Sequence, residues 1–153
     1  MAKNNFENWG ALILRVIIGI GFMAHGWAKL SRGPAGFEKL LVQTGVPLAH
    51  ITAWLVPFVE LLGGLALILG LFVTITAIPL IITMLVAMFT VQIHYGYSSV
   101  KTIGLTPQGP LFGPPGYEIN LLYIAGLVAL MFSGDGKYSL RNLISGKGAG
   151  ANR

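Results

Sequence analysis

Four long apolar segments dominate the pattern of hydrophobic and polar positions along this chain of 153 residues. They cover approximately residues 9–28, 51–72, 73–93 and 117–132. A helix that crosses a membrane needs about 20 mostly apolar residues, a length that the fourth segment does not reach. The pattern predicts an all-α integral membrane protein, built as a bundle of four transmembrane helices.

Turn and helix-end signals separate the later segments. The second and third segments follow each other directly, and only residues 70–74 are available for the turn that joins them. These two segments are therefore predicted to form a tight antiparallel helical hairpin. Pro114 and Pro115 suit the start of the fourth segment, because proline is tolerated in the first turn of a helix. The Ser-Gly-Asp-Gly sequence at residues 133–136 ends that segment.

The connection over residues 30–50 has an amphipathic pattern. Phe37 and Leu41 stand beside the charged residues Glu38 and Lys39. Such a pattern is typical of a helix that lies in the membrane interface. We therefore expect a short interfacial helix between the first and second transmembrane helices.

The connection over residues 95–116 is rich in glycine and proline, with Leu111 and Phe112 in its middle. A loop of this length often serves as a lid or a binding loop, and we expect it to fold back over the mouth of the bundle. The glycine-rich residues 144–153 are expected to form a flexible tail. The rest of the chain, residues 1–143, is predicted to form one membrane domain.

Polar side chains that are costly to bury lie within these apolar segments or at their ends. A charged group at the centre of a membrane costs roughly 2.5–3.5 kcal/mol on insertion scales, so such groups usually face a bundle interior or a cavity. The candidate site residues are Arg15, His25, Lys29, Glu60, Gln92, His94 and Glu118.

The order of the segments brings most of these side chains to one end of the bundle. At about 1.5 Å per residue, His25 lies roughly 5 Å and Glu60 roughly 13 Å from the side of the 30–50 connection. The third segment ends on this side and the fourth begins there, whereas Arg15 lies about 9 Å from the opposite side. We predict one polar pocket, reached from one leaflet, in which Arg15, His25 and Lys29 are the available partners of Glu60.

Most of these residues also have a purely structural interpretation. Arg15 and Lys29 can extend their charges to opposite interfaces. Glu118 favours the N-terminus of the fourth helix through the helix dipole, and His94 and Tyr95 suit interfacial anchors. The carboxylate in the middle of the second segment is harder to explain in this way, because at that depth it must be protonated or paired.

Composition and charge agree with a membrane protein. The chain is 54% hydrophobic and only 10% charged, and its mean hydropathy of +0.74 excludes an ordinary soluble domain. The net charge of +5 comes from basic residues at helix ends and in the tail, where they meet lipid headgroups, so we expect no nucleic-acid partner. The chain has no cysteine, which excludes thiol chemistry of its own.

The distribution of basic residues gives an orientation. The side with both termini has five lysines and arginines and the other side has four. By the positive-inside rule, this small excess favours cytoplasmic termini in the inner membrane of a bacterial cell.

The histidines and carboxylates suit zinc or non-haem iron in ligand type, but no HxxxH or ExxH pair sets two of them on one helix face. Haem held by His25 and His94 has no flanking signature. We therefore expect neither a metal nor haem.

Four stretches of the chain carry a recognisable order and spacing. They are Leu14-Arg15 through His25-Gly26 to Lys29-Leu30, Phe37 with Gly45-Val46-Pro47, Glu60-Leu61-Leu62-Gly63-Gly64 through Gly70-Leu71, and Gly116-Tyr117-Glu118 with Gly134-Asp135-Gly136. In this order they resemble the DoxX family and, more broadly, DoxD-like proteins. The resemblance covers nearly the whole chain and implies a four-helix membrane protein that works with redox partners.

DoxD-like members form a subunit of thiosulfate:quinone oxidoreductase, and other DoxX members are linked to oxidative-stress complexes. The resemblance therefore implies a membrane subunit that binds a quinone-type headgroup and supports electron transfer from an oxidoreductase partner. A quinone needs an apolar slot, hydrogen-bond partners and proton donors, which His25, Glu60 or His94 would supply. Whether the chain is an enzyme by itself stays open.

Two other classes of function also stay open. The protein is alternatively a non-catalytic membrane anchor or scaffold for an oxidoreductase, or a small transporter of protons or a solute that uses Glu60. Small residues let helices approach closely. Gly19 and Gly26, on or beside the polar face of the first segment, are therefore expected to let another helix pack closely, and the glycines at 63 and 64 leave a homodimer interface open.

Overall fold

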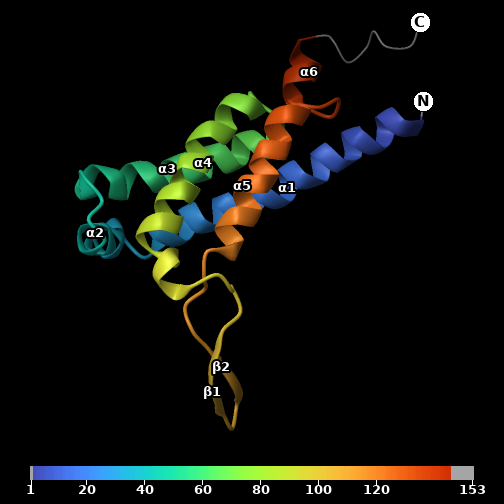
Figure 1. Cartoon of the computed structure of the whole chain (residues 1–153). Coiled ribbons are helices and arrows are strands. Elements are labelled where there is room, and N and C mark those ends of the chain that lie inside the picture. The colour runs from blue at the N-terminus through green and yellow to red at the C-terminus, as the bar shows by residue number, and fades with distance from the viewer. Residues whose placement is uncertain (1, 146–153) are drawn as a thin grey trace, which may run out of the picture.

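The computed structural model describes residues 2–145. Most of the tail expected over residues 144–153 therefore lies outside the described residues. Figure 1 shows the elements, which are α1 (Ala2–Ser31), α2 (Pro34–Gln43), α3 (Ala49–Leu69), α4 (Val73–Thr90), the 3₁₀ helix η1 (Gln92–Tyr95), strands β1 (Thr102–Thr106) and β2 (Gly109–Phe112), α5 (Glu118–Ser133) and α6 (Leu140–Ile144).

Within the described residues, three helices are long and apolar enough to cross a membrane, over Asn8–Ser31, Ala49–Leu69 and Val73–Thr90. The prediction of a mostly helical membrane protein is confirmed for these three helices. The fourth apolar helix, α5, has 16 residues. At 1.5 Å per residue it is about 24 Å long, shorter than a hydrocarbon core of about 30 Å.

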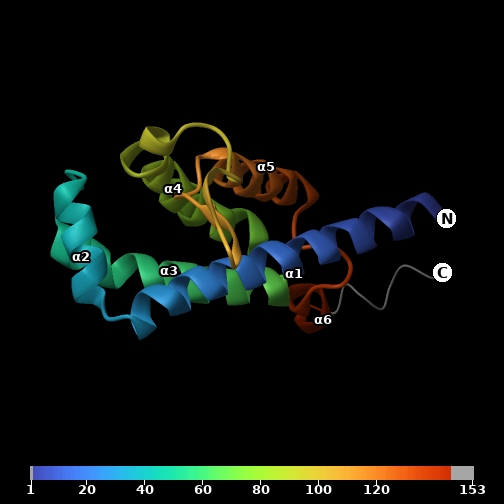
Figure 2. The same cartoon turned by 90° about the horizontal axis from the view of Figure 1, so that it is seen from below.

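The helices share two common ends. Helices α1 and α3 run side by side, and α4 lies beside α5 (Figures 1 and 2). The start of α1 and helix α6 lie at one end, whereas α2 and η1 lie at the other (Figure 1). The two long connections therefore leave the bundle at the same end, as the order of the apolar segments predicts.

Glycines bring α1 and α3 into backbone contact. A Cβ on Gly19 would lie 2.6 Å from the carbonyl oxygen of Gly64, and a Cβ on Gly26 would lie 2.7 Å from that of Pro57. The close helix approach predicted at Gly19 and Gly26 is confirmed. Gly64 lies in this contact and Gly63 packs against α4, so both glycines serve contacts within the chain. A homodimer stays a prediction.

The connection over residues 95–116 does not fold back over the bundle. Strand β1 pairs with β2 in antiparallel fashion, with Leu105 opposite Pro110, and the hairpin projects away from the helices (Figure 1). At its base, the carboxylate of Glu118 accepts a hydrogen bond from the backbone N–H of Ser99 at 2.9 Å. The expected lid was wrong, because strand pairing satisfies backbone groups without the bundle.

Candidate functional site

Lys29 and Glu60 form a buried ion pair between α1 and α3. The ammonium of Lys29 lies 2.5 Å from each carboxylate oxygen of Glu60. The Glu60 side chain is 1% exposed and that of Lys29 is 26% exposed. The contact of Gly26 with Pro57 brings the last turns of α1 against α3, so the long lysine side chain reaches the carboxylate. Glu60 is therefore paired, as expected at that depth, and its partner is Lys29.

The pair is a candidate for function because it is not an efficient way to stabilise a helix contact. Removing two charges from water costs free energy that their attraction often fails to offset, and apolar residues of similar volume often do as well or better. A charged pair within apolar helices therefore points to a role beyond packing.

Helix α2 supplies a third group at the site. The ring of Phe37 lies 5.0 Å from the ammonium of Lys29, a distance typical of a cation–π contact. Gly33, at a φ of 85°, makes the turn between α1 and α2, and Pro34 starts α2. The lysine charge is therefore held between a carboxylate and an aromatic face.

A cavity of about 630 Å³ opens beside the ion pair. Helices α2, α3 and α4 and residues 45–47 form its walls, which are mostly apolar. A volume of this size is typical of sites for small molecules and cofactors. Representative wall residues are Phe37, Leu41, Val56, Val59, Ile82 and Val86.

The other polar groups of the cavity are threonine hydroxyls that already donate to the backbone. The hydroxyl of Thr83 donates to the carbonyl of Leu80 at 2.8 Å, and that of Thr90 donates to the carbonyl of Val86 at 2.8 Å. Each hydroxyl has a single hydrogen to donate. Lys29 is therefore the cavity's main hydrogen-bond donor for a ligand.

Of the seven residues predicted for a polar pocket, the structure brings Lys29 and Glu60 together at this cavity. His25 is exposed on α1, with its ring 6.1 Å from that of Tyr123 in α5. Gln92 and His94 lie in η1. None of these lines the cavity, because the shared end of the bundle fixes their depth but not the direction in which each side chain points.

Glu118 also lies away from the cavity. Its carboxylate binds Ser99 at the base of the hairpin. The backbone N–H of Glu118 donates to the carbonyl of Tyr97 at 3.0 Å. These two bonds fasten the start of α5 to the chain that leads into β1.

Arg15 is fully buried at the opposite end of the bundle. Its guanidinium donates to the backbone carbonyls of Asp135 and Tyr138. The carboxylate of Asp135 accepts from the backbone N–H of Val73 at 2.8 Å and pairs with Arg141 at 2.6 Å. Of the three available partners predicted for Glu60, Arg15 is not the one that pairs, because both of its terminal nitrogens donate to the turn after α5. The sequence signal for this turn is Gly134-Asp135-Gly136, a pattern that by itself indicates only the end of a helix.

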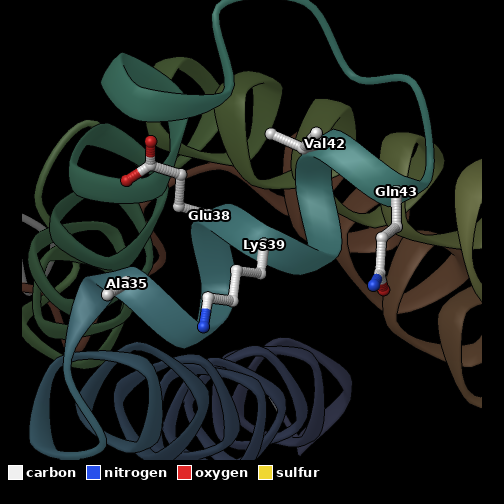
Figure 3. Close-up of a pocket in the computed structure, with 5 residues that line it drawn as sticks. All are labelled: Ala35, Glu38, Lys39, Val42 and Gln43. Carbon is white, nitrogen blue, oxygen red and sulfur yellow. The ribbon is translucent and has the colours of Figure 1, made fainter.

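A shallower pocket lies along α2. Its side chains do not converge, since Glu38 and Lys39 point in different directions (Figure 3), and the carboxylate of Glu38 is held by His50 at 3.1 Å. It is lined by Ala35, Glu38, Lys39, Val42 and Gln43. Among the residues from 2 to 145, no group of three or more histidine, aspartate or glutamate side chains is placed to hold a metal ion.

Comparison with known proteins places these features in a family. The DoxX family model matches residues 10–93, more than half of the chain and the part that contains Lys29 and Glu60. The chain is 29% identical to the "Uncharacterized membrane protein Rv3486" of Mycobacterium tuberculosis, over 88% of this chain and 80% of that protein. It is 28% identical to the "Inner membrane protein YqjF" of Escherichia coli, over 92% of this chain and 96% of that protein.

A third relative carries a name that states an activity. The chain is 33% identical to the "Putative oxidoreductase CatD" of Bacillus subtilis, over 55% of this chain and 60% of that protein. No solved structure matches the chain. With the family model covering most of α1 and all of α2, α3 and α4, this membrane protein belongs to the DoxX family.

Proposed function

We propose that this protein is the membrane subunit of a redox system, which binds a quinone-type headgroup beside Lys29 and Glu60 and supports electron transfer from an oxidoreductase partner. The observation that carries the proposal is the ion pair at the wall of a mostly apolar cavity of about 630 Å³. Apolar walls suit a quinone ring and the start of its chain, and the pair offers polar contacts.

The hydrogen-bond capacity of the pair fits a quinone carbonyl. A lysine ammonium has three donors, and Lys29 directs donors to both oxygens of Glu60. One N–H remains to donate to a carbonyl oxygen of the ligand. Because the paired charges sum to zero, the site favours a neutral headgroup over an ion.

Reduction of a quinone to a quinol forms two O–H bonds and takes up two electrons and two protons. In this proposal, the electrons come from the oxidoreductase partner and the protons come from water by way of the Lys29 ammonium. Glu60 holds that ammonium in place and accepts a hydrogen bond from a quinol hydroxyl. Lys29 and Glu60 then act as binding and proton-transfer groups.

The projecting hairpin supports the partner part of the proposal. Leu105 is 84% exposed, Phe112 is 59% exposed and Ile103 is 57% exposed. Exposed apolar patches mark interaction sites, and a two-stranded hairpin alone is marginally stable in water. The same observation favours the second candidate function, a non-catalytic anchor that recruits an oxidoreductase and binds no quinone.

The arrangement in the membrane is also part of the proposal. Helix α5 runs beside α4 between the same two ends of the bundle (Figure 1), so we take it as a fourth crossing despite its length. Helix α2 then lies at the interface, and both termini lie in the cytoplasm of a cell whose inner membrane holds the protein.

The test is binding of a quinone by the purified protein in lipid nanodiscs. In Glu60→Gln, Lys29 loses its charged partner, and we expect the affinity for the quinone to fall by about tenfold or more, as for the loss of one charged hydrogen bond. Glu118→Gln is the matched control, because Glu118 binds the base of the hairpin and does not line the cavity. Equal affinity in wild type and Glu60→Gln contradicts the proposal.

Two further readouts separate the other functions. Co-purification of an oxidoreductase by a protein that binds no quinone supports the anchor. Solute or proton flux in proteoliposomes that Glu60→Gln abolishes supports a transporter.

A further inference from the structure

The cavity beside Lys29 and Glu60 has an outer wall that faces away from the protein. Leu55 is 58% exposed, Ile82 is 54% exposed and Phe89 is 60% exposed, and all three line the cavity. They belong to α3 and α4, which are long and apolar enough to cross a membrane. The medium in front of this wall is therefore lipid hydrocarbon.

The opening extends along the helices. On α4 the lining residues run from Pro79 to Thr90, which corresponds to about 16 Å at 1.5 Å per residue. That length is more than half of a hydrocarbon core of about 30 Å. Glu60 lies roughly 16 Å from the start of α3 at Ala49, so the ion pair sits near the middle of the bilayer.

The end of the cavity toward the loops is covered by apolar groups. Phe37 and Leu41 of α2 and residues 45–47 line it there, and Leu41 is 4% exposed. The carboxylate of Glu38 binds His50 at 3.1 Å, which ties α2 to the start of α3. A ligand that came from water would have to displace this cover.

We infer that the ligand reaches the Lys29–Glu60 pair sideways from the bilayer, between α2, α3 and α4, and is a neutral amphiphile whose apolar chain remains in the lipid. The inference rests on the proposed function, because it assumes that the pair binds a headgroup. It adds the route and a requirement for a chain. The neutral sum of the pair and the hydrocarbon in front of the opening both exclude an ion as the preferred ligand.

The experiment uses two probes with the same headgroup, a benzoquinone with a long isoprenoid chain and the same benzoquinone without a chain. The full-length protein is held in nanodiscs, and probe concentrations are expressed per total sample volume. We expect the wild type to bind the chain-bearing quinone about tenfold or more tightly, since burial of the chain in hydrocarbon concentrates this probe in the bilayer in front of the opening.

Leu55→Trp obstructs the lateral opening and Leu62→Trp is its matched control. Both are exposed leucines of α3, at 58% and 64%, but only Leu55 lines the cavity. We expect Leu55→Trp to slow association of the chain-bearing quinone by about fivefold or more and Leu62→Trp to leave it unchanged. Phe89→Trp and Ile78→Trp form a second pair of the same kind on α4.

The outcomes distinguish the inference from the proposed function. If the wild type binds neither probe, the proposed function fails. If it binds both probes equally tightly, or if Leu55→Trp and Leu62→Trp change association to the same extent, quinone binding stands and lateral access is overturned.

Discussion

The ammonium of Lys29 lies 2.5 Å from both carboxylate oxygens of Glu60, across the contact between α1 and α3. Glu60 is 1% exposed, so its charge depends on this one lysine. The backbone contact of Gly26 with Pro57 determines how far apart the two helices lie at this level. The ion pair and the helix contact therefore depend on each other. A change to either should alter both the free energy of unfolding and the binding of a ligand beside the pair.

Removing one member of the pair should destabilise the protein more than removing both. Lys29→Met leaves a buried carboxylate without its partner, which costs about 3–5 kcal/mol. The double variant Lys29→Met/Glu60→Leu replaces the pair with apolar side chains, and we expect stability close to that of the wild type. Denaturant unfolding in micelles measures both.

The double variant also separates stability from function. We expect it to fold and to bind no quinone, because no charged group remains at the cavity. Quinone binding at wild-type affinity by this well-folded variant would assign the headgroup to another place in the protein.

Gly64→Ala should push α1 and α3 apart. A Cβ at this position would lie 2.5 Å from the carbonyl oxygen of Gly19, closer than real Cβ contacts. Overpacking of this kind costs about 1–3 kcal/mol. We expect a lower unfolding temperature and weaker quinone binding, because the ion pair spans the same contact.

Gly10→Ala is the control for that prediction. Gly10 also lies in α1, but a Cβ there meets nothing within 4 Å. Alanine favours a helix by about 1 kcal/mol relative to glycine, so this variant should be as stable as the wild type or more stable. A loss of stability equal to that of Gly64→Ala would remove the steric explanation.

Arg15→Met should loosen the turn after α5 without changing the site. The two backbone carbonyls that accept from Arg15, those of Asp135 and Tyr138, would lose their donor. An unsatisfied buried polar group costs about 1–3 kcal/mol. We expect lower stability and faster proteolysis within residues 134–145, with unchanged quinone affinity of the folded protein.

Arg141→Met tests whether the buried Arg15 stabilises the turn more than the exposed Arg141 does. Arg141 pairs with the same aspartate, but its side chain is 52% exposed. Exposed pairs contribute about 0–1 kcal/mol. A larger loss of stability in Arg141→Met than in Arg15→Met would show that the surface pair, and not Arg15, holds the turn.

The apolar helices and the glycine contact were predictable because both depend on local patterns. The length of the apolar segments predicted the helices, and the spacing of Gly19 and Gly26 predicted that α1 approaches another helix closely. The pairing of Glu60 with Lys29 was not predictable. Arg15, His25 and Lys29 share one face of α1, and the choice among them depends on the rotation of α3 about its axis.

Two long-range features were also outside the reach of sequence patterns. The turn around Asp135 binds Arg15 across 120 residues of chain, and nothing near Arg15 indicates that partner. The β-hairpin forms from residues whose glycines and prolines favour turns. Its strand pairing depends on the register of β1 against β2, with Leu105 opposite Pro110, which composition does not reveal.

Leu105→Ser should weaken the association with an oxidoreductase partner and leave the membrane domain intact. Leu105 is 84% exposed on the projecting hairpin, so its replacement costs little folding free energy but removes a large apolar contact. Interface positions of this kind cost about 1–2 kcal/mol or more when truncated, about fivefold to thirtyfold in affinity. Leu143→Ser is the matched control, since Leu143 is 71% exposed in α6 at the opposite end. Co-purification of an oxidoreductase measures the effect, and equal recovery with wild type and Leu105→Ser would place the docking surface elsewhere.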